Sequence, residues 1–340
     1  MSGQTTGSPA GQGFDYDVIV IGGGAAGLSG AVALARFRRS VAVIDSGEPR
    51  NAPAEGVHNL LGRENVSPAD LLATGRAELA GYGGAVITGV VATAEHDQQL
   101  GGFEVGLTDG RRFRARRLLL ASGVVDTLPD LPGVAELWGR AVLHCPYCHG
   151  WEFRDQAIGI LATGPMATHQ ALMFRQLSDD VLLFRHTAAL DDDQLEQLAA
   201  RGITVIDGEV TALERDPSGE LAGVRLAGGT VVPRQAIVVA PTMEARAGFL
   251  TTLGLQPEPV EVNGVRIGSK IAADGNGATA VPGVWAAGNL TNPMAHVMIS
   301  AAAGLTAGAV INGDLITEET AAAVAAARAR AQPQPLDPVG

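Results

Sequence analysis

The sequence contains 340 residues, of which 46% are hydrophobic and 45 are glycine, and its formal net charge is −12. This length is enough for roughly two domains of ~100–200 residues, and the apolar fraction is sufficient for a substantial core. Nucleic acids and anionic membranes bind clustered positive charge, so the acidic balance argues against both as partners.

The N-terminal region predicts the opening of a doubly wound parallel α/β sheet. Residues 1–13 are rich in Gly, Ser, Gln and Thr, which indicates a disordered tail rather than a signal peptide. Residues 16–21 predict a buried strand, followed by a glycine-rich turn, a helix to about Arg36 and a second strand at 41–45. No apolar run reaches the ~18–20 residues of a membrane span, and the expected location is the cytoplasm.

The middle of the chain alternates between strands and helices. A helix is predicted at 66–82, entered through Ser67-Pro68. Strands are predicted at 86–94, 102–108, 111–121, 157–161, 181–184 and 236–240, with a hairpin-like passage at 209–232. Five arginines in one of these strands are expected to form a solvated face; they are Arg111, Arg112, Arg114, Arg116 and Arg117.

The C-terminal region repeats the strand, glycine turn and small-residue helix of the first domain. A strand is predicted at 284–287, a turn at Gly288 and an Ala/Gly-rich helix from about His296 to Asn312. A separate Ala/Arg helix is expected from Thr317, trailing into a frayed tail.

Residues 22–27, Gly-Gly-Gly-Ala-Ala-Gly, directly follow the first predicted strand and directly precede its helix. This G-x-G-x-x-G pattern is typical of a dinucleotide-binding turn. Gly22 permits the tight turn, Gly24 lets the backbone approach a pyrophosphate, and Gly27 packs the helix on the strand. The helix N-terminus adds partial positive charge at the two intervening residues, Ala25 and Ala26.

Further positions identify the dinucleotide as FAD. Asp45, 21 residues after Gly24, is the acidic residue expected to bind ribose hydroxyls. Residues 121–123, Ala-Ser-Gly, match the middle motif of two-dinucleotide-binding-domain flavoproteins, which places Ser122 and Gly123 at the cofactor. Residues 284–289 resemble their second FAD motif, in which an Asp follows the glycine. In this sequence Gly288 is followed by an uncharged residue that still forms hydrogen bonds, Asn289.

The only two cysteines, Cys145 and Cys148, form a C-x-x-C pair flanked by His144 and His149. In a reducing cytoplasm such a pair indicates redox chemistry or metal binding. Zinc would require both histidines as further ligands, although neighbouring residues seldom face one ion. Cys-x-x-Cys-His also matches the c-type haem attachment pattern, which requires export. A buried, inert pair is the remaining alternative.

The order of these motifs resembles that of the low-molecular-weight thioredoxin reductases over about residues 15–312. The resemblance implies an α/β fold with two Rossmann-like dinucleotide-binding domains, the second inserted in the first, and a homodimer. It also implies that Cys148 faces the flavin and that Cys145 exchanges with substrate. His149 then occupies the place of an acid–base aspartate, a task that suits a histidine.

This organisation divides the chain into four parts. We expect residues 14–125 and 246–318 to form a discontinuous FAD-binding domain, and residues 126–245 to form an inserted NAD(P)-type domain carrying the cysteine pair. Residues 1–13 and 319–340 are expected to be a disordered tail and a frayed helix with a tail.

The inserted domain departs from the NADPH-binding pattern. Only Gly164 is in glycine register in its fingerprint, and Pro165 removes an N–H that would face a phosphate. Residues 185–187, Arg-His-Thr, stand where a 2′-phosphate-binding arginine cluster is expected. The acidic residues 191–193 follow, and we expect them to cap a helix starting near Asp192. NADPH is therefore doubtful as a cofactor.

A second departure lies near the C-terminus, where His296 precedes Val297-Met298. His296 is expected either to sit over the flavin or to cap a helix. Together with the Cys-Pro-Tyr-Cys-His segment, these departures resemble the gliotoxin- and holomycin-type oxidases of small dithiols. The resemblance implies attack of a substrate thiolate on Cys145, release of Cys148 toward the flavin, and reoxidation by dioxygen. His149, with His144, would remove the thiol protons.

Three functions remain open at this point. A dioxygen-dependent dithiol oxidase is the preferred hypothesis. An NADPH-dependent thioredoxin-disulfide reductase, or an enzyme using another reductant such as ferredoxin, is the first alternative. A non-enzymatic flavin redox sensor is the second. The expected partners are a small dithiol or disulfide, or a thioredoxin-like protein.

Overall fold

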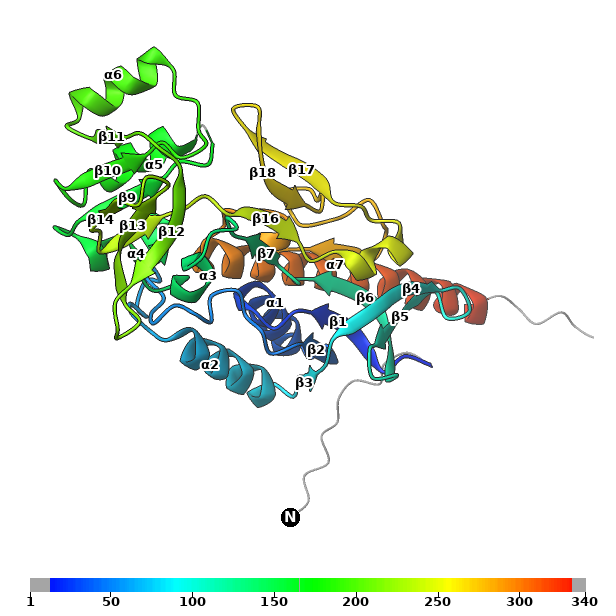
Figure 1. Cartoon of the computed structure of the whole chain (residues 1–340). Coiled ribbons are helices and arrows are strands. Elements are labelled where there is room, and N and C mark those ends of the chain that lie inside the picture. The colour runs from blue at the N-terminus through cyan, green and yellow to red at the C-terminus, as the bar shows by residue number, and fades with distance from the viewer. Residues whose placement is uncertain (1–12, 165, 332–340) are drawn as a thin grey trace, which may run out of the picture.

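The computed structural model describes residues 13–164 and 166–331, which form two lobes (Figure 1). Two antiparallel strands connect the lobes, β7 (Val124–Thr127) and β16 (Thr242–Ala245). The α/β class predicted from the sequence is confirmed. The expected domain boundaries at 125–126 and 245–246 fall at these two strands, and the expected N-terminal tail lies outside the described residues except for Gly13.

The larger lobe contains a seven-stranded sheet in the order β3-β2-β1-β6-β5-β4, with β19 also paired to β6. Its central strands pair in parallel, and their apolar side chains are buried on both faces, as is usual in such sheets. The strands are β1 (Tyr16–Ile21), β2 (Val41–Asp45), β3 (Ala85–Thr88), β4 (Val91–Asp97), β5 (Gly102–Leu107), β6 (Arg112–Leu120) and β19 (Val284–Ala286).

Helices and short 3-10 turns complete the larger lobe. Ser67 caps α2 by accepting a hydrogen bond from Asp70 N at 3.0 Å, which confirms the predicted entry of this helix. The helical elements are α1 (Ala25–Arg36), α2 (Pro68–Gly81), η2 (Gly248–Leu253), η3 (Gly288–Leu290) and α7 (Val297–Ala331).

The smaller lobe is built on a five-stranded parallel sheet in the order β11-β10-β9-β15-β8. A three-stranded antiparallel sheet, β12-β13-β14, packs beside it. The strands are β8 (Val142–Leu143), β9 (Ile158–Leu161), β10 (Val181–Phe184), β11 (Thr204–Ile206), β12 (Val210–Arg215), β13 (Leu221–Leu226), β14 (Val231–Val232) and β15 (Ala236–Val238). The helical elements are α3 (Val134–Leu137), α4 (Pro146–His149), η1 (Trp151–Phe153), α5 (Met166–Phe174) and α6 (Asp192–Ala200).

Two strand predictions were incomplete. The strand expected at 86–94 is divided into β3 and β4, because β3 pairs in parallel with β2 whereas β4 runs antiparallel to β5. The chain changes direction at Gly89, whose N–H donates to Asp45 O at 2.9 Å. The hairpin of β17 (Glu258–Val262) and β18 (Val265–Lys270) was not predicted, because its exposed charged side chains obscure the strand pattern.

The two helices expected near the C-terminus are one continuous helix, α7. Its buried residues recur every three or four positions from Ser300 to Leu315 and pack against α1. The two backbones meet at glycines: a Cβ on Gly304 would lie 1.9 Å from Ala26 O, and one on Gly308 would lie 2.7 Å from Gly30 O. Only glycine permits this approach.

By length and composition alone, α7 could cross a membrane, whereas no segment of this kind was predicted from the sequence. Its buried stripe between residues 300 and 315 belongs to the core of the larger lobe. We therefore interpret α7 as a core helix, since such helices pass the same test of length and composition.

The prediction of a solvated arginine face was wrong for two of its five members. The side chains of Arg116 and Arg117 are only 11% and 13% exposed and form ion pairs with α7. Arg116 also pairs with the buried Asp17 at 3.0 Å. The ion pairs with α7, to Asp314, Glu318 and Glu319, attach the helix at and beyond the end of its buried stripe. Residue 319 therefore lies within an anchored helix rather than at the start of a frayed one.

Candidate active site at a dinucleotide cradle and a cysteine pair

The glycine-rich turn between β1 and α1 forms an open cradle. Gly22 has a φ of +107°, and a Cβ there would lie 2.3 Å from Ala121 O. Gly24 caps α1 without a side-chain hydrogen bond, and no heavy atom lies within 4 Å of its Cβ position. The first N–H groups of α1, near Ala25 and Ala26, therefore face open space and are suited to an anionic group.

Asp45 at the end of β2 lies beside this cradle. Its Oδ1 accepts a hydrogen bond from Gly23 N at 3.0 Å, which fixes the carboxylate and leaves Oδ2 for a ligand hydroxyl. Gly27, in contrast, serves packing, because a Cβ there would lie 1.8 Å from Gly22 O. The arrangement fits the adenosine end of a dinucleotide such as FAD.

Ser122 and Gly123 follow β6 and lie across from the cradle. Ser122 Oγ donates to Arg246 O at 2.8 Å, and Gly123 adopts a φ of +72°. Gly288 is buried between α1 and α7, where a Cβ would lie 2.7 Å from the Cβ of Ala26. This close packing accounts for a glycine at position 288.

A single cleft of about 880 Å³ connects the cradle to the cysteine pair. Its size is at the upper end of ligand-binding cavities, which are typically ~300–1,000 Å³. Most predicted site residues line it: Gly22, Gly24, Ala25, Ala26, Asp45, Ser122, Gly123, His144, Cys145, Cys148, His149 and Asn289. Gly27 and Gly288 do not line it, in keeping with their packing contacts.

Cys145 and Cys148 form a disulfide with a Cα–Cα distance of 5.3 Å. Cys145 is the N-cap residue of the four-residue helix α4, and Pro146 occupies the first helical position, where its missing N–H costs nothing. Both cysteines are partly exposed and line the cleft, so they are not the buried, inert pair considered from the sequence. The disulfide is accessible to an attacking thiolate.

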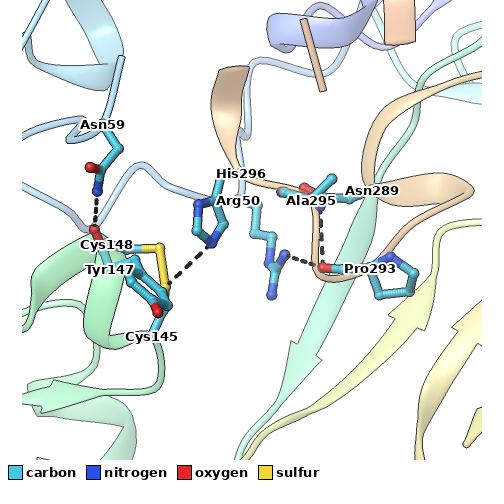
Figure 2. Close-up of a disulfide and its surroundings, with 9 residues drawn as sticks. All are labelled: Arg50, Asn59, Cys145, Tyr147, Cys148, Asn289, Pro293, Ala295 and His296. Atoms are coloured by element: carbon cyan, nitrogen blue, oxygen red, sulfur yellow. Dashed lines mark hydrogen bonds between the residues drawn. A yellow bond between two sulfur atoms is a disulfide. The ribbon is translucent and has the colours of Figure 1, made fainter. Parts of the chain in front are cut away.

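His296, which immediately precedes α7, lies next to the disulfide. Its Nε2 is 3.7 Å from Cys145 Sγ (Figure 2). Its ring is also 6.2 Å from that of Tyr147, the residue between the cysteines. Neither of the two positions predicted for His296, over the flavin or at a helix cap, included contact with Cys145 Sγ. The two residues are 151 positions apart in sequence.

Asn289 holds the loop that carries His296. Its Nδ2 donates to Asn292 O, Pro293 O and Ala295 O at 3.2, 3.2 and 2.8 Å. Arg50 adds a bond to Pro293 O at 3.2 Å (Figure 2). The guanidinium is itself fixed by both carboxylate oxygens of Asp126. From its sequence position Asn289 was predicted to contact the cofactor, and this role in holding the loop was not predicted.

The two histidines beside the cysteines have different surroundings. His144 stacks on Trp138 with ring centroids 5.5 Å apart. Burial, with a smaller contribution from the charge of Arg50, lowers the pKa of His144 to about 4, so its ring is neutral near pH 7. Burial also lowers the pKa of His149, whose ring meets that of His58 edge-on at 6.2 Å.

The zinc alternative named His144 and His149 as ligands, but the structure groups different residues. Within the described part of the chain, Cys145, Cys148 and His296 have potential ligand atoms within 4.8 Å of one another. Structural zinc requires deprotonated thiolates, and a closed disulfide offers none. The trio is instead arranged for proton exchange with a sulfur leaving group.

In the second nucleotide-type unit, both residues that stand where phosphate-binding arginines are expected have protein partners. Arg185 Nη1 pairs with Asp207 Oδ1 at 3.1 Å, and His186 Nδ1 accepts from Val210 N at 3.0 Å. Asp191 forms a capping box with Gln194 at the start of α6, which confirms that these acids cap a helix. Pro165 lies outside the described residues.

Comparison with known proteins is consistent with this geometry. Residues 16–306 match the family model described as pyridine nucleotide-disulphide oxidoreductase. The chain belongs to this family. As a pyridine nucleotide-disulphide oxidoreductase of the thioredoxin reductase type, it is a flavoprotein disulfide oxidoreductase with a C-x-x-C pair, and membership implies FAD binding.

Several members of the family are similar over most of their length. The crystal structure of HlmI is 45% identical with a TM-score of 0.87, and the match covers 95% of this chain and 99% of HlmI. An oxidoreductase from Agrobacterium tumefaciens is 34% identical with a TM-score of 0.82, covering 89% and 99% of the two chains. Thioredoxin reductase tcpT of Claviceps purpurea (strain 20.1) is 32% identical over 320 residues, which are 89% of this chain and 95% of tcpT.

Proposed function

We propose that this protein is a FAD-dependent dithiol oxidase that converts a small dithiol into a disulfide, with dioxygen as the final electron acceptor. The proposal depends on one observation: the exchanging disulfide, a histidine 3.7 Å from Cys145 and the dinucleotide cradle share one cleft. Bound FAD would supply the two-electron acceptor for the reduced cysteine pair.

The chain's own residues account for the thiol chemistry. A thiol attacks a disulfide as its thiolate, so a base must first remove its proton. His296 is placed to take that proton at Cys145, where the new sulfur–sulfur bond to substrate forms and the bond to Cys148 breaks. The second substrate sulfur then displaces Cys145, which leaves the substrate as a disulfide and the enzyme as a dithiol.

Two further observations support an oxidase over a nicotinamide-dependent reductase. Arg185 pairs with Asp207, and His186 accepts a hydrogen bond from the backbone of Val210, so both residues at the expected 2′-phosphate position already contact protein groups. HlmI is also similar over almost the whole chain, and the Cys-Pro-Tyr-Cys-His segment resembles the small-molecule dithiol oxidases.

The second candidate function is an NADPH-dependent thioredoxin-disulfide reductase. It is favoured by the retained five-stranded parallel sheet of the smaller lobe and by relatives such as tcpT, whose name is thioredoxin reductase. A flavin redox sensor without turnover is a third candidate, distinguished by a reducible flavin that supports no dithiol oxidation.

Anaerobic titration of the purified holoprotein separates these candidates. The absorbance of oxidised flavin is followed after addition of NADPH, NADH or dithiothreitol in separate cuvettes. The oxidase proposal predicts bleaching only by the dithiol, with recovery of the band and formation of peroxide when air is admitted. Rapid bleaching by NADPH alone would overturn it and identify a reductase.

A further inference from the structure

An exposed tyrosine ring lies between the two cysteines of the disulfide. Tyr147 is the second residue of α4, and it is 63% exposed although it lines the cleft. Its ring centroid is 6.2 Å from that of His296, the residue whose Nε2 contacts Cys145 Sγ. The ring therefore stands beside the place where a substrate sulfur meets the disulfide (Figure 2).

The backbone that carries this ring is fixed. The peptide N–H groups of Cys148 and His149 donate to Cys145 O at 3.3 and 3.2 Å, which closes the short helix. Asn59 Nδ2 donates to Tyr147 O at 2.6 Å (Figure 2). A tyrosine side chain has only two χ angles, so a ring on a fixed backbone loses little conformational entropy when a ligand packs on it.

The loop that carries His296 adds a second exposed apolar side chain. Met294 is 60% exposed and lines the same cleft. Its N–H donates to Asn292 Oδ1 at 3.2 Å, within the turn that Asn289 holds. A methionine side chain is flexible and polarisable, so it adapts to ligands of different shape and makes favourable contacts with aromatic rings. The two segments that meet at the contact of His296 with Cys145 thus each present an apolar group to the cleft.

The charges near the disulfide favour an uncharged ligand. The ring of His144 is neutral near pH 7, and burial lowers the pKa of His149. The guanidinium of Arg50 is already neutralised by its carboxylate partner. The carboxylates of Glu152 and Glu55 lie near enough to His149 to act on its pKa. A negatively charged dithiol would be repelled by these two carboxylates as it approached the disulfide.

We propose that Tyr147, together with Met294, is a specificity-determining residue that binds the apolar ring of a small, uncharged dithiol while its sulfurs exchange with the disulfide. This inference rests on the proposed oxidase function and names its substrate class. Offset or edge-to-face packing on the exposed tyrosine ring gives ring-bearing dithiols an advantage over open, polar ones. The same packing holds the substrate sulfurs near Cys145 and His296 for both steps of the exchange.

Trp151 provides a matched control for an exposed aromatic residue. It follows α4 as the first residue of η1 and is also 63% exposed, but it does not line the cleft. The guanidinium of Arg154 covers its ring, with Cζ 4.4 Å from the ring centroid. Non-specific attraction of an apolar ligand to this surface would involve both aromatic residues, whereas the proposed site involves Tyr147 and not Trp151.

The test compares two dithiols in anaerobic flavin reduction by the holoprotein at pH 7. Dithiothreitol and ortho-xylylenedithiol both oxidise to cyclic disulfides of the same ring size, but only the second carries an aromatic ring. The measured quantity is the ratio of the second-order rate constant for ortho-xylylenedithiol to that for dithiothreitol, with flavin content determined for each variant. Tyr147→Ala should lower this ratio about ten-fold, the upper end for one aromatic contact, and Met294→Ala should lower it less.

Tyr147→Phe should keep the wild-type ratio because it retains the ring, and Trp151→Ala should keep it as well. A purely structural role of Tyr147 would slow both dithiols equally, so an unchanged ratio in Tyr147→Ala overturns the inference while the oxidase proposal stands. An equal fall of the ratio in Trp151→Ala also overturns it. If neither dithiol reduces the wild-type flavin, the oxidase proposal itself fails, and the substrate class fails with it.

Discussion

Replacing Asn289 by Asp should uncouple flavin binding from dithiol reactivity. In the sequence pattern of related flavoproteins an aspartate follows the glycine at this position, so the substitution restores the residue expected at the cofactor. In this chain, however, the amide of Asn289 donates to three carbonyl oxygens of the loop before His296. A carboxylate cannot donate and would face the same oxygens with negative charge.

The size of the effect follows from those contacts. An amide nitrogen carries two N–H groups, and each hydrogen bond contributes ~1 kcal/mol net, so their loss removes ~2 kcal/mol from the loop. Because ~1.4 kcal/mol is a tenfold change, this lowers the population with His296 beside Cys145 by as much as ~30-fold. Arg50 still holds Pro293 O, which makes this figure an upper limit.

The assay compares flavin content with the rate of anaerobic flavin reduction by dithiothreitol at pH 7. Asn289→Asp should retain FAD but react up to ~30-fold more slowly, and Asn289→Ala, which loses the same two N–H donors, should slow the reaction to a similar extent. His296→Asn provides a double-mutant cycle: if Asn289 acts through His296, adding Asn289→Asp to His296→Asn causes no further loss. Wild-type rates in Asn289→Asp, or additive losses in the double variant, would refute the reasoning.

Two further predictions concern stability. The pKa of His144 is about 4 in the folded protein and near 6.5 when unfolded, so the unfolded state binds more protons between these values and stability falls as the pH drops. His144→Phe keeps the stack on Trp138. In this variant the free energy of unfolding, measured in urea, should decrease by up to ~2 kcal/mol less between pH 7 and pH 5 than in wild type. An unchanged pH dependence of this free energy would contradict a lowered pKa for His144. Arg116→Met leaves the buried Asp17 without its cation and should cost ~3 kcal/mol, whereas Arg112→Met, at an exposed pair, should cost at most ~1 kcal/mol. Equal thermal stabilities of these two variants would argue against a buried ion pair.

The parts of the site that depend on local sequence were predictable. The turn requires a residue that tolerates positive φ at Gly22 and a close approach at Gly27, and this requirement is visible within one six-residue pattern. The ribose-binding position of Asp45 was predicted from its spacing after the glycines, which is set by the usual length of a βαβ unit. The cysteine pair is likewise contained in four consecutive residues.

Contacts between distant segments were not predictable in this way. His296 reaches Cys145 only because α7 returns to α1, and the glycines that permit this approach are indistinguishable in sequence from other small residues. Arg116 and Arg117 look like exposed strand residues because their acidic partners lie about 200 positions later. Hydrophobic periodicity reports burial against a core, not the identity of an ionic partner.

The close approach of α1 and α7 also affects how tolerance to substitution should be read in this protein. Gly30, Gly304 and Gly308 have their missing Cβ atoms opposed by backbone atoms of the facing helix, and none of them lines the cleft. In a saturation mutagenesis experiment they should be as intolerant as Cys145, although they contact no reactant. The amount of folded protein therefore needs to be measured together with activity at each intolerant position. Activity alone would wrongly assign the glycines of the α1–α7 contact to the active site.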